Sequence, residues 1–273
     1  MTNIFLILTY IFIFFTLWIL IEAQVYRVRR VKIVNSKIPK SFNKFKIVFI
    51  SDIHFGKFFR AKRLINIVNR INKLDADIII IGADYLAISV KSKRDVSSYL
   101  DKEMEILNNL KAKLDIYTVL GNHDYYNRKD ALLNEINSSS FVLLKNTRRF
   151  INIGEESIEL VGIDDLVEGD PEVNMLKENS NNFTIAISHN PDFFSDYKNL
   201  INYDLGLSGH THGGQVTFFG LYAPYTSSKY GQRYLNKLIN EEKRDIVLTN
   251  GIGNGTLPIR FFAIPEIVEI NLE

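Results

Sequence analysis

The five histidines of this chain lie in four short polar motifs that follow apolar runs typical of β-strands, and a fifth such motif carries an aspartate. The motifs are Asp52-Ile53-His54, Gly82-Ala83-Asp84, Gly121-Asn122-His123-Asp124, Ser188-His189-Asn190-Pro191 and Gly209-His210-Thr211-His212. Imidazole, carboxylate and amide groups delivered at strand ends are the ligand types for borderline divalent metals such as manganese, iron or zinc. The pattern therefore predicts a metal-dependent hydrolase.

Alternating strands and helices must position these motifs. Apolar strands are expected at 46–50, 78–81 and 116–120 and helices at 61–73 and 95–111, which predicts a parallel sheet at the start of the domain. The second half is richer in strands, at 150–153, 157–163, 184–188, 205–208, 246–249 and 267–272, with helices at 171–179 and 192–199. We therefore predict an α/β fold: a four-layer αββα sandwich of two mixed sheets.

This architecture would bring the motifs together, because ligands of open α/β sheets bind beyond the carboxyl ends of the strands. Asp52 and His54 are two residues apart, so in an extended strand exit they would point the same way, and His210 and His212 repeat that spacing. Two such pairs with a carboxylate between them can hold two cations roughly 3.5–4 Å apart. The stretch 220–232, rich in Tyr, Ser and Gly, is expected to form a long loop near this site.

In this order, the motifs resemble those of the calcineurin-type metallophosphoesterase superfamily over about residues 45–273. The strings at 188–192 and 208–215, with Leu257-Pro258-Ile259-Arg260 and Pro265-Glu266, are similar to its bacterial membrane-associated phosphodiesterase branch. That branch includes a UDP-2,3-diacylglucosamine pyrophosphatase of the lipid A pathway. Ala83 departs from the pattern, because many relatives have Gly before the aspartate; Ala fits there if its φ is negative.

The resemblance implies two metal sites that share one ligand. Residues Asp52, His54 and His212 would bind the first metal, Asn122, His189 and His210 the second, and Asp84 both. His123 would act on the substrate, by stabilising transition-state oxygens or by protonating the leaving group. Taken singly, each histidine fits an ordinary polar role, Asp84 a cap and Asn122 a left-handed turn; together, in this order, they favour metal ligands.

Other residues near the motifs have two readings each. Arg260 is expected to contact a substrate phosphate, with a surface ion pair as the alternative. Asp124 is expected to orient the site or cap a helix, and 164–165 either supports the site or forms a turn. The aromatic residues after the first motif are expected either to form an apolar rim for an acyl chain or to be buried in the core; they are Phe55, Phe58 and Phe59.

The expected cofactors are two divalent metal ions, manganese first, with iron, zinc or cobalt as alternatives. Their charge exceeds that of Asp52, Asp84 and a bridging hydroxide by about one unit, which favours a phosphate anion and the extra negative charge of its transition state. We expect in-line attack of the bridging hydroxide on phosphorus, since water bound to a metal ionises near neutral pH.

The amino terminus differs from the rest of the chain. Residues 4–21 carry no charge and are almost entirely Ile, Leu and Phe, which is long enough for a spanning helix. The alternative is a cleaved signal peptide, but no Lys or Arg precedes the run and Glu22-Ala23-Gln24 is a poor cleavage site. We therefore expect 1–24 to be a retained membrane anchor, 25–44 a basic juxtamembrane stalk and 45–273 the catalytic domain.

Charge suggests the side of the membrane. Eight Lys or Arg residues and no acid lie between Glu22 and Asp52, which by the positive-inside rule places the catalytic domain on the cytoplasmic face of a single-pass protein. A solvated basic linker is the alternative reading. The net charge of +2 gives no reason to expect nucleic acid as a partner, and the absence of Cys excludes thiolate ligands.

Together these features predict a hydrolase that cleaves phosphodiester or pyrophosphate bonds in a lipid-linked substrate such as UDP-2,3-diacylglucosamine at the membrane lipid bilayer. Two alternatives stay open. One is an extracytoplasmic phosphodiesterase that acts on cell-wall or phospholipid phosphodiesters. The other is a non-catalytic metal-binding scaffold, which the intact set of ligand types disfavours.

Overall fold

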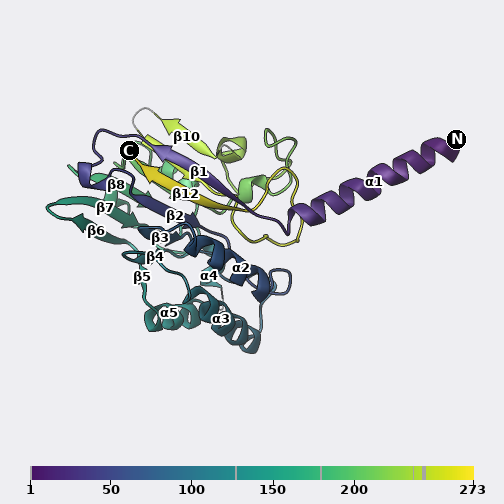
Figure 1. The fold of residues 1–273 in the computed structure, drawn as a ribbon, viewed down its shortest axis with the longest axis horizontal. Helices are drawn as coiled ribbons and strands as arrows, with labels where there is room; N and C mark the ends of the chain where they lie inside the picture. Colours follow the sequence, from purple (N-terminus) through teal and green to yellow (C-terminus); the bar gives the residue numbers. More distant parts are fainter. Residues whose placement is uncertain (1, 127, 179, 236, 242–243) are drawn as a thin grey trace.

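Short apolar runs pair into two mixed sheets of six strands each (Figure 1). The computed structural model describes residues 2–126, 128–178, 180–235, 237–241 and 244–273. The first sheet has the order β1 (Arg27–Ile33), β12 (Glu266–Leu272), β2 (Lys46–Ile50), β3 (Ile78–Ile81), β4 (Ile116–Thr118) and β5 (Phe141–Leu143). The second has the order β10 (Leu238–Glu241), β11 (Arg244–Leu248), β9 (Leu205–Ser208), β8 (Phe183–Ile187), β7 (Glu156–Gly162) and β6 (Thr147–Ile153).

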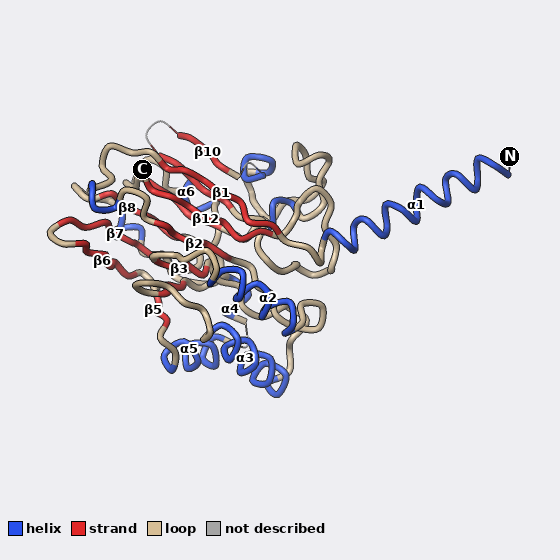
Figure 2. The backbone as a smooth tube through the Cα atoms, in the orientation of Figure 1, coloured by secondary structure: helices blue, strands red, loops and turns tan. Residues whose placement is uncertain are grey.

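Alternation along the strands builds the layers. Ile47 and Phe49 of β2 pack between the two sheets, whereas Val48 and Ile50 pack against the outer helices. Helices α2 (Ala61–Asn72), α3 (Lys93–Leu107) and α5 (Lys129–Ser138) flank the first sheet (Figure 2). The thinner outer layer of the second sheet includes η2 (Val173–Leu176) and α6 (Asp192–Asp196). The predicted αββα sandwich is therefore confirmed.

Some elements differ from the prediction. Of the helix expected at 171–179, residues 171–178 form only a short 3₁₀ turn, and residue 179 lies outside the described residues; the helix expected at 192–199 ends at Asp196. Helix α5 was not predicted, since it buries only Leu132 and Ile136 and its apolar stripe is too short to show a period. The remaining short elements are η1 (Lys40–Phe42), α4 (Asn122–Tyr125), η3 (His212–Gly214) and η4 (Gly231–Leu235).

The segment 25–44, predicted as a basic stalk, is instead part of the folded domain. Its strand β1 pairs in parallel with β12 over seven residues. Arg27 and Arg29 both form ion pairs with the buried carboxylate of Glu266, at 3.0 Å each. The sequence could not reveal this pairing, because the carboxylates lie more than 230 positions away. Only residues 23–26 connect β1 to the N-terminal helix α1 (Thr2–Glu22).

A buried acid on α3 makes the stability of the fold depend on pH. Glu103 is fully buried, and neither of its oxygens has a hydrogen-bond partner among the described residues. Burial, with a contribution from Asp124, raises the pKa of Glu103 well above its ordinary value. Because the folded protein holds this proton more tightly than the unfolded chain, the free energy of unfolding should fall as pH rises above about 4.3.

The variant Glu103→Gln, which imitates the protonated acid, should remove this dependence. We expect it to be more stable than the parent at pH 8 by at least about 1 kcal/mol, since one pKa unit is worth about 1.4 kcal/mol. The difference should shrink at pH 4. Urea unfolding at both pH values measures it, and an equal difference at both would contradict the buried-acid account.

Candidate metal centre

The five polar motifs follow five strands, and all five meet where the carboxyl ends of the two sheets lie together. Residues 52–54 follow β2, 82–84 follow β3, 121–124 follow β4, 188–191 follow β8 and 209–212 follow β9. The side chains of Asp52, His54, Asp84, His189 and His212 are buried there, and those of Asn122, His123 and His210 are partly exposed. The structure thus brings together every ligand residue that the sequence predicts.

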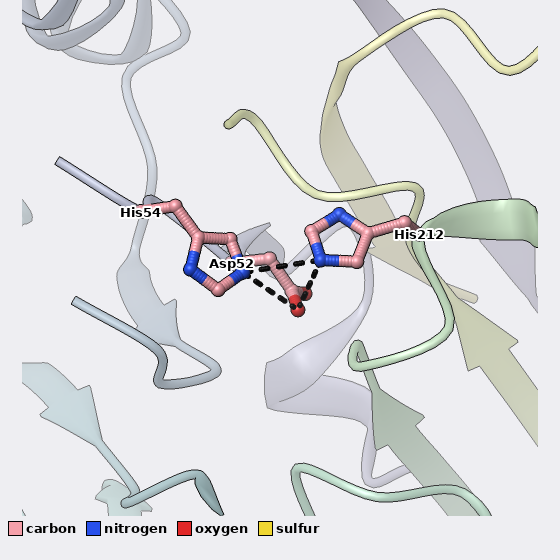
Figure 3. Close-up of side chains that lie close together, drawn as sticks. All are labelled: Asp52, His54 and His212. Atoms are coloured by element: carbon pink, nitrogen blue, oxygen red, sulfur yellow. Dashed lines mark hydrogen bonds and ion pairs between the residues drawn. The ribbon is translucent and has the colours of Figure 1, made fainter. Parts of the chain in front are cut away.

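Asp52, His54 and His212 form the first group, and their side chains point toward one another in Figure 3. The Nε2 atoms of the two histidines are 3.1 Å apart, and they lie 4.0 Å (His54) and 3.5 Å (His212) from Asp52 Oδ1. Ligand atoms each about 2.1 Å from one ion lie roughly 3 to 4.2 Å apart. The spacing therefore fits three atoms that face a common cation.

Asp84, His189 and His210 form the second group. Asp84 Oδ2 lies 3.2 Å from His189 Nε2 and 3.7 Å from His54 Nε2, so one oxygen atom is close to both groups. Asn122 Oδ1 is buried and has no hydrogen-bond partner among the described residues, and His189 Nε2 faces the Asp84 carboxylate. An unpaired buried amide oxygen, one residue before the backbone N–H that donates to Asp84, fits a site built for a cation.

Backbone carbonyls orient two of the imidazoles. His189 Nδ1 donates to the carbonyl of Gly82 at 2.7 Å, and His210 Nε2 donates to that of Ser227 at 3.1 Å. Each bond fixes the proton on one ring nitrogen and leaves the other nitrogen with a free lone pair. Ser227 lies in the stretch 220–232, so this predicted loop does reach the site.

Burial shifts the pKa values of most of the proposed ligand residues toward their neutral forms. It lowers the pKa of His54 to about 3 and that of His210 to about 4, so both imidazoles are neutral at pH 7. Burial also raises the pKa of Asp52 to about 6. For Asp84 and His189 burial favours the neutral forms, but attraction between the two outweighs it, lowering the pKa of Asp84 and raising that of His189. Divalent cations would provide these carboxylates with stronger positive partners.

Three of the five motifs contain residues with a left-handed backbone, not the extended backbone that was predicted. Positive φ angles occur at Asp52 (52°), His54 (47°), Ala83 (80°), Asp84 (54°), His210 (65°) and His212 (52°). The condition set for Ala83, a negative φ, is therefore not met. Such conformations of non-glycine residues cost of order 1–3 kcal/mol each and are found mainly at functional sites. Turns, not pleated strand ends, direct these side chains inward.

Asp124 orients the motifs around it. Its carboxylate accepts hydrogen bonds from the backbone N–H groups of Asp84, Tyr85 and Gly121, at 2.9, 2.9 and 3.0 Å. The predicted role as an orienting or capping residue is therefore confirmed. Asp165 instead accepts from the backbone N–H groups of Val167 and Glu168, which is the turn alternative.

The structure places Arg260 beneath the site, away from where a substrate would bind. The side chain is fully buried. Its five N–H groups have five oxygen acceptors within 3.3 Å: the carbonyls of His212, Asn250, Gly253 and Ala263 and the side chain of Asn254. No donor remains for a phosphate. The expected substrate contact and its surface alternative are both corrected: Arg260 joins the His212 loop to the loops at 250–254 and 260–263.

Replacing Arg260 by Met should therefore destabilise the protein. The buried carbonyls would lose their partners, at about 1–3 kcal/mol for each unsatisfied group, so we expect a loss of at least about 3 kcal/mol. Urea denaturation measures this loss. A substrate contact would instead raise KM and leave the free energy of unfolding unchanged, and that result would contradict the structural role.

A pocket of about 490 Å³ opens over the two groups. Asp84, His123, His210 and His212 form its polar floor. Apolar and aromatic residues form much of the wall: Ile88, Tyr126, Val216, Pro224, Tyr225 and Leu257. Pro224 and Tyr225 belong to the predicted loop 220–232, whereas Ile88, Tyr126 and Val216 were not predicted to lie near the site. Of the aromatics considered as a rim, Phe55 and Phe59 are buried in the core, and Phe58 is 47% exposed.

The comparisons with known proteins agree with this geometry. A sequence model described as calcineurin-like phosphoesterase matches residues 45–214. An uncharacterized metallophosphoesterase of Bacillus subtilis is 29% identical over 88% of this chain and 83% of its own length. A phosphodiesterase of Escherichia coli, YaeI, is 27% identical over 84% of this chain and 82% of its own length.

Other relatives are longer than this chain. The chain spans 64% of an uncharacterized metallophosphoesterase of Helicobacter pylori that is 29% identical over 90% of it. It spans 58% of a transmembrane protein with metallophosphoesterase domain from Danio rerio, 27% identical over 92% of the chain. Among solved structures, a dimetal phosphatase from Danio rerio superposes with a TM-score of 0.50 at 12% identity, over 77% of this chain and 88% of that one. That likeness shows the shared fold.

Proposed function

Because this chain belongs to the calcineurin-like phosphoesterase family, a family of metal-dependent hydrolases, we propose that it is a two-metal phosphodiesterase or pyrophosphatase held at a membrane. One observation carries the proposal: two groups of ligand atoms lie side by side and share the Oδ2 atom of Asp84. A non-catalytic scaffold would not need both groups. The relative named as a phosphodiesterase supports this type of bond.

The proposed ligands are Asp52, His54 and His212 for one cation and Asn122, His189 and His210 for the other, with Asp84 shared. Two bound divalent cations would supply positive charge to the phosphoryl oxygens and lower the pKa of water, and manganese is our first choice of metal. The carbonyls of Gly82 and Ser227 would hold a proton on one ring nitrogen of His189 and of His210 and leave the other nitrogen of each ring for a cation.

His123 is the proposed substrate-facing group. It lines the pocket, and one of its ring nitrogens lies within 4.8 Å of the ligand atoms of His54 and Asp84. Burial lowers its pKa, so the imidazole is neutral at pH 7. A neutral ring can donate one hydrogen bond, and we therefore favour stabilisation of a phosphoryl oxygen over protonation of the leaving group.

The proposed substrate is lipid-linked, such as UDP-2,3-diacylglucosamine. The apolar wall of the pocket is suited to an aliphatic segment next to the phosphate. Helix α1 supports a membrane location, because it is long and apolar enough to cross a bilayer, with a mean hydropathy of 2.8. We propose that residues 1–24 remain as the anchor and that the domain lies on the cytoplasmic face; phospholipid or cell-wall phosphodiesters on the outer face are the alternative.

The full-length protein in detergent should hydrolyse bis-p-nitrophenyl phosphate after addition of Mn²⁺, and EDTA should abolish the reaction. Failure with each of manganese, zinc, iron and cobalt would count against a hydrolase. A mass-spectrometric assay of UDP-2,3-diacylglucosamine beside common phospholipids then tests the substrate. Alkaline phosphatase fused after Glu273 reports the side of the membrane, and its activity there would contradict the cytoplasmic placement.

A further inference from the structure

An unusually apolar loop lies between the metal motifs and the end of the chain. We call residues 216–225 the aromatic loop. It folds back on itself through a bridge between Phe218 and Tyr222. Its exposed side chains are large and apolar: Phe218 (56% exposed), Phe219 (75%), Leu221 (81%), Tyr222 (52%) and Tyr225 (75%). A contiguous patch of this kind on a folded protein marks a surface that something covers.

The aromatic loop is continuous with α1. Phe219 contacts Phe262, with ring centroids 4.8 Å apart, and Phe262 contacts Trp18 of α1 at 6.4 Å. Phe261 contacts Phe15 of α1 at 5.9 Å. The chain around these rings is also bonded to the helix, because the backbone N–H of Arg260 donates to the carbonyl of Ile19 at 3.1 Å. Figure 1 shows the yellow loop that precedes β12 beside the base of α1.

The length of α1 fixes the depth of these contacts. The helix has 21 residues, which corresponds to about 32 Å along its axis. The hydrocarbon layer that it would cross is about 30 Å thick, so almost the whole helix would lie inside that layer. Phe15 precedes Glu22 by seven residues, or about 10 Å along the helix. The ring of Phe261, which contacts Phe15, must therefore lie on the membrane side of the end of α1.

Positive charge surrounds the same end of the domain. A groove of about 550 Å³ is lined by Leu20 and Gln24, at and just beyond the end of α1, and by the cationic residues Lys57, Arg60, Lys62 and Arg63. Three of these cations are exposed. Cations beside an apolar surface are the arrangement that anionic lipid headgroups attract.

We propose that the aromatic loop, together with Phe261 and Phe262, inserts into the interfacial layer of the bilayer that α1 crosses. Val216, Pro224 and Tyr225 of this loop also line the metal pocket, so its mouth would open at the membrane surface. A lipid-linked phosphoester would enter without leaving its leaflet. The inference rests on the proposed function only in taking α1 as a membrane span.

Tryptophan fluorescence tests the depth directly, because Trp18 is the only tryptophan of the chain. In the Trp18→Phe background, Phe219→Trp places a reporter on the aromatic loop. Phe150→Trp is the matched control, since Phe150 is 50% exposed on β6, at the other end of the domain from α1 (Figure 1). Both full-length variants are reconstituted in phosphatidylcholine–phosphatidylglycerol vesicles, with and without brominated acyl chains.

We expect brominated lipid to reduce the fluorescence of the reporter at 219 at least twofold, and acrylamide to have little effect on it. At position 150 we expect acrylamide to quench the fluorescence and brominated lipid to have little effect. Equal acrylamide quenching at both positions would overturn the proposal. Shielding of position 219 from both quenchers would also overturn it, in favour of a protein that covers the loop. The readout needs no turnover, so it is separate from the test of the hydrolase, and resistance of the protein to carbonate extraction independently checks that α1 is inserted.

A second variant connects the loop to catalysis. Phe219→Ser with Leu221→Ser removes the two most exposed side chains of the turn, neither of which lines the pocket. Turnover of a vesicle-embedded lipid phosphodiester should fall about tenfold, while hydrolysis of soluble bis-p-nitrophenyl phosphate stays the same. If the variant hydrolysed both substrates at the rates of the parent, the loop would have no role at the membrane.

Discussion

Replacing Asp84 by Asn should abolish turnover and remove bound metal. The substitution keeps the shape of the side chain and an oxygen to accept from the backbone N–H of His123, which now lies 3.0 Å from Asp84 Oδ1. It removes the negative charge that both groups share. Loss of several kcal/mol of charge stabilisation corresponds to a rate lower by roughly 10³-fold or more.

Metal analysis of the purified variant should give less than one equivalent of metal, against two for the parent. Asp101→Asn is the control, because Asp101 is an exposed acid on α3, outside the site. Circular dichroism and thermal unfolding confirm that both variants fold. Two full equivalents of metal with an unchanged rate would remove Asp84 from the centre.

Replacing His123 by Ala should lower kcat by about 10² to 10⁴ while the metal content stays at two equivalents. The imidazole lines the pocket over Asp84, but in our proposal it faces the substrate and binds no cation. Because the neutral ring is proposed to stabilise a phosphoryl oxygen, the loss should be similar for p-nitrophenyl and alkyl esters.

A different outcome would reassign His123. A much larger loss for alkyl esters, whose leaving groups need a proton, would make it the general acid. Loss of metal would make it a ligand, since His54, Asp84 and His123 also offer atoms within 4.8 Å of one another. Asn122→Ala is the matched comparison, because the neighbouring amide is a proposed ligand and its loss should reduce both the metal content and the rate.

The sequence was sufficient for the layers and for the meeting point of the motifs. An apolar run such as 78–81 predicts a strand buried on both faces, and parallel strands bring their carboxyl ends to one edge. The convergence of Asp52 with Asp84, after β2 and β3, and of His189 with His210, after β8 and β9, follows from that rule. The rule depends on where a strand ends and not on the backbone angles that follow it, so it holds even for the three motifs that contain left-handed residues.

Contacts that depend on distant partners could not be predicted. Arg260 looked like a substrate-binding cation, because a sequence does not show that five oxygen atoms already surround its guanidinium. The basic residues of 25–44 looked like a linker, because Glu266 and Glu269, which pair with Arg27, Arg29 and Arg30, follow more than 200 positions later. Both errors have one cause: side-chain charge is visible in a sequence, but its neutralisation across a sheet or loop is not.

The connection of four residues between α1 and β1 determines how such an enzyme would search for its substrate. A long tether would let the domain sample a wide volume of solution, whereas this connection would hold the proposed active site at a constant distance from the bilayer. Encounters would then be governed by lateral diffusion in two dimensions, and the surface density of substrate, not its bulk concentration, would set the rate. Inserting a flexible Gly-Ser segment after Gln24 would release the domain from that plane.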